Sequence, residues 1–225
     1  MKSTLFKDFD ERSQEVRSYF LFIKNLEYGS IQLNVVNAKS SNPKKINNNL
    51  AKTLKATGFL LLYNLVESTM TNAIETIFDE LKNQNVSFDD VREELKKIII
   101  ENFKKNNSTE KLLVDIQSIS VDIISSGFDK QKLFSGNIDA KKIREIASKY
   151  GFSFQTNARK TQNGADLLKI KTSRNDLAHG LKSFEDVGKD LTADELLRIQ
   201  KRVICYLKAI LENIDDYISK KEYLK

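Results

Sequence analysis

The only histidine of the chain follows closely after an arginine and an asparagine. His179 lies in the segment KTSRNDLAHG, five residues after Arg174 and four residues after Asn175. Because a helix turns about 100° per residue, a helix here would place Asn175 and His179 on one face and Arg174 on the neighbouring edge. An imidazole can move a proton near neutral pH, and a guanidinium can stabilise the charge on a pentavalent phosphorus. These groups suit the cleavage of RNA by its own 2'-hydroxyl, which requires no metal ion.

Each residue of this motif has a predicted role, and the histidine has a structural alternative. His179 would transfer protons, and Arg174 would hold phosphate oxygens through two parallel hydrogen bonds. Asn175 would orient the imidazole or contact the ribose or the scissile phosphate. In the alternative, His179 only ends a helix, where a protonated imidazole interacts favourably with the helix dipole and Gly180 forms the C-terminal cap. The motif by itself leaves both interpretations open.

The counts of other reactive residues exclude several kinds of site. One histidine and one cysteine exclude zinc sites rich in these residues, which leaves a purely carboxylate site as the only metal site the protein could build. Glycine-rich phosphate loops and nucleophile elbows are absent. Because the RNA cleavage described above requires no metal ion, we predict no metal and no cofactor. Cys205 lies among apolar residues of the last predicted helix, so we expect a buried structural thiol.

The composition favours a helical domain that can bury a core. Of 225 residues, 40% are hydrophobic, 8 are glycine and one is proline, which is too few turn residues for a fold of many short strands. We predict a single all-α domain over residues 1–225. A lone cysteine forms no internal disulfide, and neither a signal peptide nor an apolar stretch of bilayer length is recognisable, so we expect a cytoplasmic protein with no membrane partner. A net charge of +6 permits RNA binding without arguing for it.

Apolar residues at helical spacing predict the elements of the N-terminal half. A first helix ends at Gly29, and an exposed loop covers residues 37–49, which contain the only proline. A long helix follows over about 50–83. It is apolar on every side around 59–63, so it should lie between other helices or at a subunit contact. Two further helices are predicted, one capped by Ser87 and reaching about residue 103, the other capped at Ser108–Thr109.

In the C-terminal half, the helix that carries the motif lies between two capped helices. Asp139 is expected to cap a helix that Gly151 ends. A basic loop is predicted over 152–164 and a helix over 165–179. The remaining predicted features are a turn that contains Gly180 and Gly188, the capping box Thr192–Glu195, and a last helix that reaches about Tyr217.

Three segments of the chain resemble the HEPN superfamily, and most closely the MAE-type HEPN proteins of bacterial defence loci. They are GFLLLYNLVESTMTNAIETIF (58–78), FSGNIDAKKIREIASKYGF (134–152) and KTSRNDLAHGLKSFEDVGKD (171–190). The signature of the family is an arginine, a polar residue, and a histidine after four to six intervening residues. Arg174, Asn175 and His179 match this signature with four intervening residues.

The resemblance implies a HEPN-like helical bundle with an elaborated helical periphery. It also implies a homodimer that brings two motifs into one cleft, and a metal-independent endoribonuclease that leaves a 2',3'-cyclic phosphate. Such a protein would be a toxin or an antiviral effector that cuts tRNA, mRNA or foreign RNA, with an antitoxin or another defence protein as a possible partner. Two alternatives stay open: a non-catalytic HEPN module that binds RNA, nucleotide or a protein, and a purely structural partner of another protein.

The resemblance extends to residues outside the motif. Glu67 matches an acidic position that many of these nucleases carry on an earlier helix, and it could pair with Arg174 or aim His179; an ordinary solvated glutamate is the alternative. In HEPN toxins that are silenced by modification of a tyrosine, that tyrosine lies two residues after the histidine. Here the position is Leu181, so we do not expect this control. Five basic residues near the motif could guide an RNA backbone or could form a solvated face: Arg159, Lys160, Lys169, Lys171 and Lys182.

Overall fold

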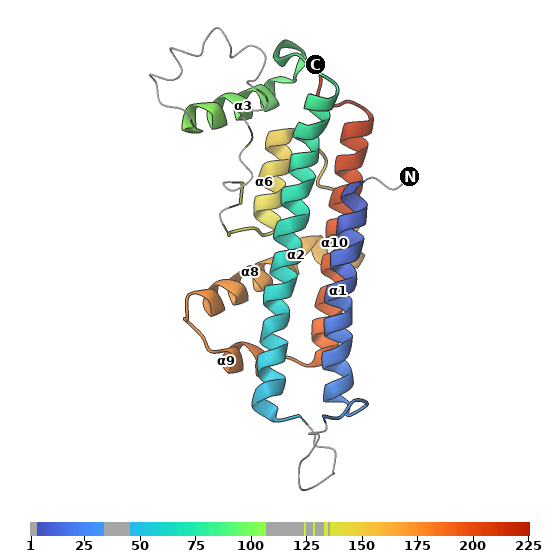
Figure 1. The fold of residues 1–225 in the computed structure, drawn as a ribbon, viewed down its shortest axis with the longest axis vertical. Helices are drawn as coiled ribbons and strands as arrows, with labels where there is room; N and C mark the ends of the chain where they lie inside the picture. The colour runs from blue at the N-terminus through green and yellow to red at the C-terminus, as the bar shows by residue number, and fades with distance from the viewer. Residues whose placement is uncertain (1–3, 34–45, 107–123, 125–127, 129–132, 135) are drawn as a thin grey trace.

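Three long helices lie side by side and form the body of the molecule (Figure 1). They are α1 (Thr4–Glu27), α2 (Asn48–Asn83) and α10 (Ala193–Ser219). The structure is a computed structural model that describes residues 4–33, 46–106, 124, 128, 133–134 and 136–225. The helices of these residues confirm the predicted all-α fold.

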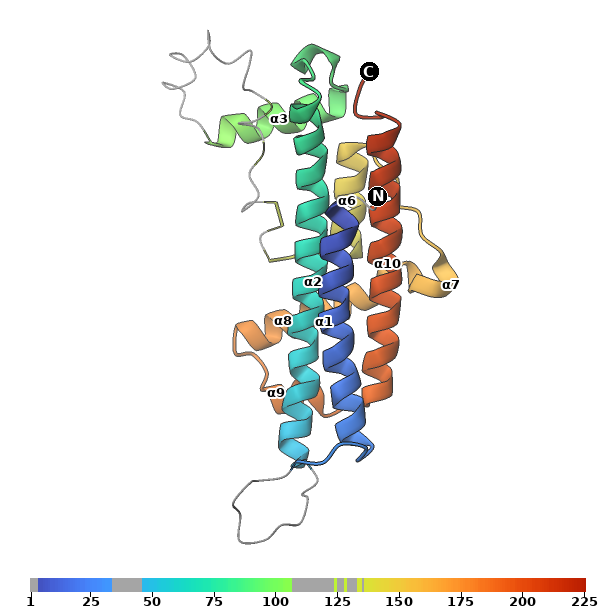
Figure 2. The ribbon, with the colours of Figure 1, turned by 45° about the vertical axis from the view of Figure 1, so that its right-hand side comes forward.

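Shorter helices surround this body. α8 and α9 contact α2 and project from one side of the bundle, whereas α7 contacts α10 and lies on the opposite side (Figure 2). The bounds of the shorter helices are η1 Phe88–Asp90, α3 Glu93–Asn106, α6 Ala140–Tyr150, α7 Ala158–Thr161, η3 Gln162–Gly164, α8 Ala165–Ala178 and α9 Phe184–Gly188. Among the described helices, none combines the length and the apolar character that a bilayer crossing requires.

α2 is the central helix of the core. Its buried side chains include Tyr63 and Leu65, which are two residues apart and therefore lie about 160° apart around the helix axis. The helix contacts α1 and α10 with one part of its surface and α8 and α9 with another. The prediction that this apolar stretch lies between other helices is therefore confirmed.

Several predicted helix ends are formed by the expected caps. The Asp139 side chain accepts a hydrogen bond from the backbone N–H of Lys142 at 2.9 Å, and Gly151 ends α6 with a φ of 86°. Thr192 and Glu195 form the reciprocal hydrogen bonds of a capping box at the start of α10. Local capping chemistry thus fixed these ends as predicted.

Other boundaries differ from the prediction. The loop predicted over 37–49 ends earlier, because the Asn47 side chain caps α2 and residues 48–49 are already helical; residues 34–45 lie outside the described residues. The basic loop predicted over 152–164 contains α7 and η3, because Asn157 caps a short helical turn. Ser87 caps η1, and α3 begins only at Glu93.

Three further differences concern the second half of the chain. The helix predicted after Ser108–Thr109 lies outside the described residues. The turn predicted over 180–188 contains α9. Cys205 is exposed on α10, so the expectation of a buried thiol was wrong. Its apolar neighbours Val203, Ile204 and Leu207 are buried instead, because a position one or two residues away from them faces another side of the helix.

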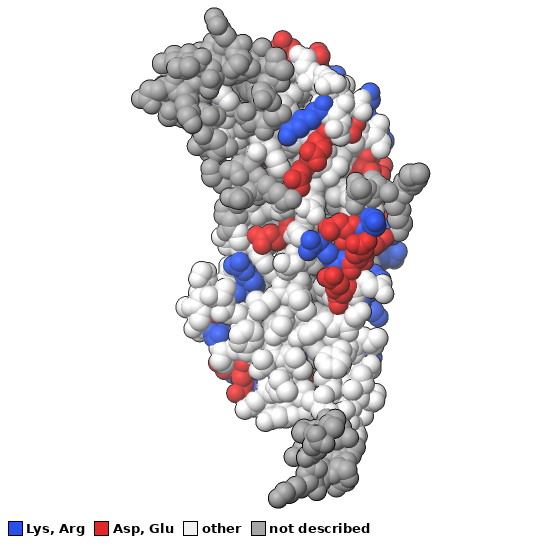
Figure 3. Space-filling view, viewed as in Figure 1, with Lys and Arg blue, Asp and Glu red and all other residues white. Residues whose placement is uncertain are grey.

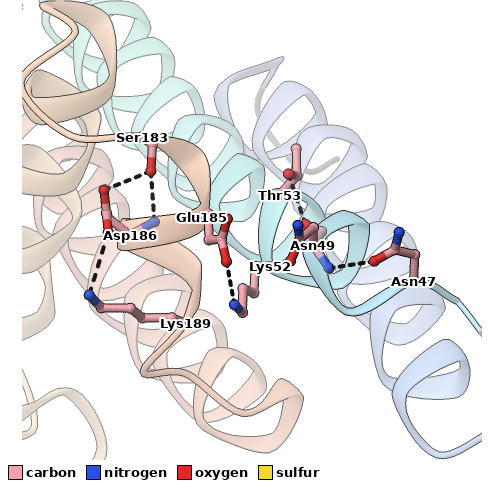
Figure 4. Close-up of polar contacts among 8 residues, drawn as sticks. All are labelled: Asn47, Asn49, Lys52, Thr53, Ser183, Glu185, Asp186 and Lys189. Atoms are coloured by element: carbon pink, nitrogen blue, oxygen red, sulfur yellow. Dashed lines mark hydrogen bonds and ion pairs between the residues drawn. The ribbon is translucent and has the colours of Figure 1, made fainter.

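α9 is held tightly against the start of α2 (Figure 4). The Ser183 side chain caps α9 by accepting from the N–H of Asp186 at 3.0 Å, and Lys52 of α2 lies 2.5 Å from the carboxylate of Glu185. A Cβ atom on Gly188 would lie only 2.0 Å from the carbonyl oxygen of Lys52, so only glycine allows this approach. These contacts fix the chain that follows the motif helix.

Candidate functional site

Ion pairs to two neighbouring helices hold α8, which carries the motif. Asp166 in its first turn is paired with Arg202 of α10. Farther along, Lys171 is hydrogen-bonded to the carboxylate of Asp139, the residue that caps α6. The motif residues therefore lie on a helix whose position is set by α6 and α10 as well as by its contact with α2.

His179 ends α8 in a Schellman motif. The N–H of Leu181 donates to the carbonyl of Asp176 at 2.8 Å, the N–H of Gly180 donates to the carbonyl of Leu177, and Gly180 has a φ of 67°. The predicted helix end at His179–Gly180 is thus confirmed, and it is compatible with both interpretations of the histidine. His179 is exposed, and its imidazole makes no hydrogen bond with another described residue. The ring is therefore accessible to a ligand or to a second molecule.

Arg174 lies on the side of α8 that faces α2. Its guanidinium carbon lies 4.8 Å from the centroid of the Tyr63 ring, and its Nη1 donates to Oδ1 of Asn175 at 3.0 Å. Gly136 approaches from the segment before α6, where an added Cβ would lie 3.4 Å from Nη1 of Arg174. Among the described residues, Arg174 forms no ion pair. Its positive charge is therefore held in place by neutral groups.

Asn175 connects the motif to the segment before α6. Its side-chain amide donates to Oδ1 of Asn137 at 3.4 Å while its Oδ1 accepts from Arg174. Its contact with His179 is through the backbone, where the His179 N–H donates to the Asn175 carbonyl at 3.0 Å. In this chain Asn175 thus bonds the side chain of Arg174 but not the imidazole.

Glu67 lies one turn after Tyr63 on α2 and is half-buried. Glu67 and Arg174 form no direct ion pair, but both interact with Tyr63. Burial raises the pKa of the Tyr63 hydroxyl, the hydrogen bond from the Ile138 N–H lowers it, and the negative charge of Glu67 raises it further, so that the net shift is upward. Tyr63 therefore stays protonated and neutral, with the carboxylate close to its hydroxyl.

The five basic residues are divided between two parts of the structure: three lie on α8 or directly after it, and two lie on α7. Arg159 and Lys160 are on α7, on the opposite side of the bundle from α9. Lys171 is bound to Asp139, and Lys182 lies 2.8 Å from the carboxylate of Asp176. Lys169 is exposed on α8. On the face shown in Figure 3, basic and acidic side chains are mixed, mainly over the middle and upper part of the molecule, and they form no single positive surface.

A cavity of about 510 Å³ opens beside the motif helix. Lys169, Ser173 and Asp176 of α8 line it on one side, and α9 with the turn after it lines the other. Its walls contain lysine and aspartate side chains, so a polar ligand would find both hydrogen-bond donors and acceptors there. Within the described residues, no group of three or more histidine, cysteine, aspartate and glutamate side chains could hold a metal ion.

The sequence analysis missed the groups that hold Arg174. Tyr63 has one signal in the sequence, because it precedes Glu67 by four residues and so lies on the same helix face. Gly136 and Asn137 have none, because they meet α8 only after α6 and α8 have packed together.

A family model matches almost the whole chain. The family is described as HEPN_MAE_28990-like HEPN, and the match covers residues 1–223. Searches of curated proteins and of solved structures gave no match. The matched range includes α8 with the Arg174–His179 motif and α2 with Glu67.

Proposed function

The chain belongs to the HEPN_MAE_28990-like HEPN family, and from this membership and the geometry of α8 we propose that it is a metal-independent endoribonuclease. It acts as a toxin or an antiviral effector on tRNA, mRNA or foreign RNA in the cytoplasm. One observation carries the proposal: Arg174, with no ion-pair partner among the described residues, and the accessible imidazole of His179 lie within two turns of the same helix. A guanidinium without a carboxylate partner is available to a phosphate group.

In the proposed reaction, the 2'-oxygen of a ribose attacks the adjacent phosphorus. The 2'-hydroxyl gives up its proton to a base, the bond from phosphorus to the 5'-oxygen breaks, and the leaving oxygen takes a proton from an acid. The products are a 2',3'-cyclic phosphate and a 5'-hydroxyl. His179 transfers protons, and Arg174 stabilises the negative charge on the phosphate oxygens. Asn175 keeps Arg174 in place while Arg174 contacts the substrate.

The reaction requires a base and an acid, whereas each chain has one histidine. We therefore propose a homodimer in which two copies of His179 face one phosphate. The exposure of His179 supports this arrangement, as does Leu181, an apolar residue that is 72% exposed two positions later. Lys169 and the cavity beside α8 would contact the RNA next to the scissile bond. An antitoxin or another defence protein would restrain the activity.

Incubation of purified protein with labelled RNA in EDTA tests the proposal. We expect cleavage by the wild type, 2',3'-cyclic phosphate ends on the products, and losses of about 10²-fold or more in His179→Ala and Arg174→Ala. Arg17→Ala is the matched control, because it removes an exposed arginine of α1 that belongs to no proposed site. Equal cleavage by all four proteins, or none by the wild type under any activating condition, would contradict the proposal.

A non-catalytic binding module is the second candidate. It is favoured by the lack of any side-chain hydrogen bond between His179 and the other two motif residues. RNA binding without cleavage, unchanged by His179→Ala, would support it. Toxicity on expression that disappears in His179→Ala would support the nuclease.

A further inference from the structure

We propose that Tyr63 is the positioning residue of this site and that Glu67 acts through it. The ring of Tyr63 fixes the guanidinium of Arg174 without neutralising its charge, and the Glu67 carboxylate interacts with the hydroxyl of that ring. The proposal rests on the proposed function, in which Arg174 stabilises the phosphate.

The ring is a fixed platform for the guanidinium. Tyr63 is only 3% exposed, and its hydroxyl accepts a hydrogen bond from the N–H of Ile138 at 3.3 Å. The ring is thus tied to the segment that contributes Gly136, the other neighbour of Arg174. With the guanidinium carbon 4.8 Å from the ring centroid, the cation lies within the range in which a π face attracts it.

The groups that surround Arg174 are neutral, and this matters for catalysis. A carboxylate would position an arginine well, but it would also occupy the N–H groups that a phosphate requires. Arg202 shows this arrangement, since Asp166 takes two of its hydrogen bonds. Arg174 instead gives one hydrogen bond to the Asn175 amide oxygen and rests on a ring. A guanidinium has five N–H donors, so most of those of Arg174 remain for the phosphate oxygens.

Glu67 acts at the hydroxyl of Tyr63, one helical turn farther along α2. The Tyr63 hydroxyl accepts from Ile138, which leaves its own proton to be donated toward Glu67, and the charge of Glu67 acts on that hydroxyl. A carboxylate next to the hydroxyl makes the ring more electron-rich, and a cation is attracted more strongly to such a ring. Glu67 thus brings a negative charge near Arg174 without forming a direct ion pair with it.

Two substitutions distinguish the contribution of the Tyr63 ring from that of its hydroxyl. Tyr63→Phe keeps the π face and removes the link to Glu67, whereas Tyr63→Leu removes both. Phe78→Leu is the matched control, because Phe78 is a fully buried ring on the same helix that packs against Phe128 and Tyr150 instead of Arg174. Tyr63→Met serves as the second variant if Tyr63→Leu does not fold.

The first measurement is the kinetics of RNA cleavage. We expect kcat of Tyr63→Leu to fall about tenfold, in line with the strength of a partly desolvated cation–π contact, while KM changes little. Tyr63→Phe should keep most of the activity and should abolish the effect of Glu67→Gln. A purely structural role would lower the yield of folded protein and leave kcat per folded molecule unchanged, as expected for Phe78→Leu.

The second measurement does not depend on activity. In NMR spectra of arginine-labelled protein, the Arg174 side-chain signals, assigned with Arg174→Lys, should be shifted by the ring current of Tyr63. The shift should persist in Tyr63→Phe and Phe78→Leu and disappear in Tyr63→Leu or Tyr63→Met. Unchanged Arg174 signals in the two aliphatic variants, or cleavage by them as fast as by Phe78→Leu, would overturn the proposal. A wild type that shows the shift but cleaves no RNA would contradict the proposed function alone.

Discussion

Arg202 of α10 donates two hydrogen bonds to the carboxylate of Asp166 in the first turn of α8, at 2.6 and 2.9 Å. The pair joins the last long helix to the helix that carries the motif. The carboxylate also lies at the end of α8 where the helix dipole favours negative charge. The position of Arg174 and His179 thus depends on a contact near the opposite end of their own helix.

Replacement of Arg202 by glutamine should lower the free energy of unfolding by about 2 kcal/mol, because it removes two charge-assisted hydrogen bonds from a partly buried carboxylate. Urea unfolding followed by circular dichroism measures this loss. Lys208→Gln is the control on the same helix, since its pair with Glu212 is exposed and should contribute less than about 0.5 kcal/mol. A loss in Arg202→Gln no larger than in the control would show that the pair does not anchor α8.

Gly188→Ala should destabilise the protein by about 1–3 kcal/mol, because the new methyl group would lie against the Lys52 carbonyl and push α9 away from α2. The thermal unfolding midpoint gives the size of the effect. Glu185→Gln, which removes the ion pair of Lys52 and leaves the backbone contact intact, should cost less than about 1 kcal/mol. If both variants unfold at the same temperature, the close approach is not what holds α9.

The carboxyl of Asp139 predicts a pH dependence of stability. Burial alone would raise its pKa, but the hydrogen bonds from Lys171 and from the N–H of Lys142 outweigh burial, so the pKa lies below the ordinary value of 3.8. A depressed pKa in the folded state stabilises the protein above 3.8, and this stabilisation is lost as the pH falls through the lower pKa of the folded state.

Asp139→Asn keeps a side chain that can cap α6 but removes the charge. We expect it to be about 1–2 kcal/mol less stable at neutral pH and to lose less stability than the wild type on acidification. The measurement is the free energy of unfolding of both proteins from neutral pH to below 3.8, and the slopes against pH are compared. Parallel curves for the two proteins would mean that another group causes the acid sensitivity.

The proposed dimer predicts an effect of Leu181→Glu. Two copies of His179 that act on one phosphate bring the two copies of Leu181 close together, so a charge there should be repelled by its symmetry mate and should oppose association. Analytical ultracentrifugation should show more monomer, and cleavage should fall in parallel. Leu21→Glu replaces another exposed leucine, on α1, and should change neither. A dimer that is unaffected by Leu181→Glu would place the subunit contact elsewhere.

Helix boundaries show where local patterns are sufficient. Asp139, Gly151 and the Thr192–Glu195 box gave correct helix ends because each cap is satisfied by backbone groups within a few residues. The same principle identifies Asn47 and Ser183 as caps once their helices are seen. Asn47 was missed because it follows a stretch rich in polar residues, and Ser183 was missed because the five residues of α9 are too few to show an apolar pattern.

The candidate site also has features that the sequence predicted and features that it did not. The spacing of Arg174, Asn175 and His179 predicted a shared helix, and the structure has the first two on α8 and the third as its C-terminal cap. The same spacing did not predict that Asn175 would bond Arg174 and Asn137 rather than the imidazole. The partner of a side chain depends on which other helix packs against it, and a distance along the sequence does not contain that information.

The sequence by itself determined the longer helices, several of their caps and the order of the motif along one helix, because these depend on hydrogen bonds and apolar spacing within a few residues. Only the tertiary structure decided that Tyr63 lies under Arg174, that Gly136 lies beside it and that Cys205 faces outward. Those contacts join segments that are far apart in the chain. They form only when the helices pack in one particular arrangement, which is set by the shapes of many buried side chains together.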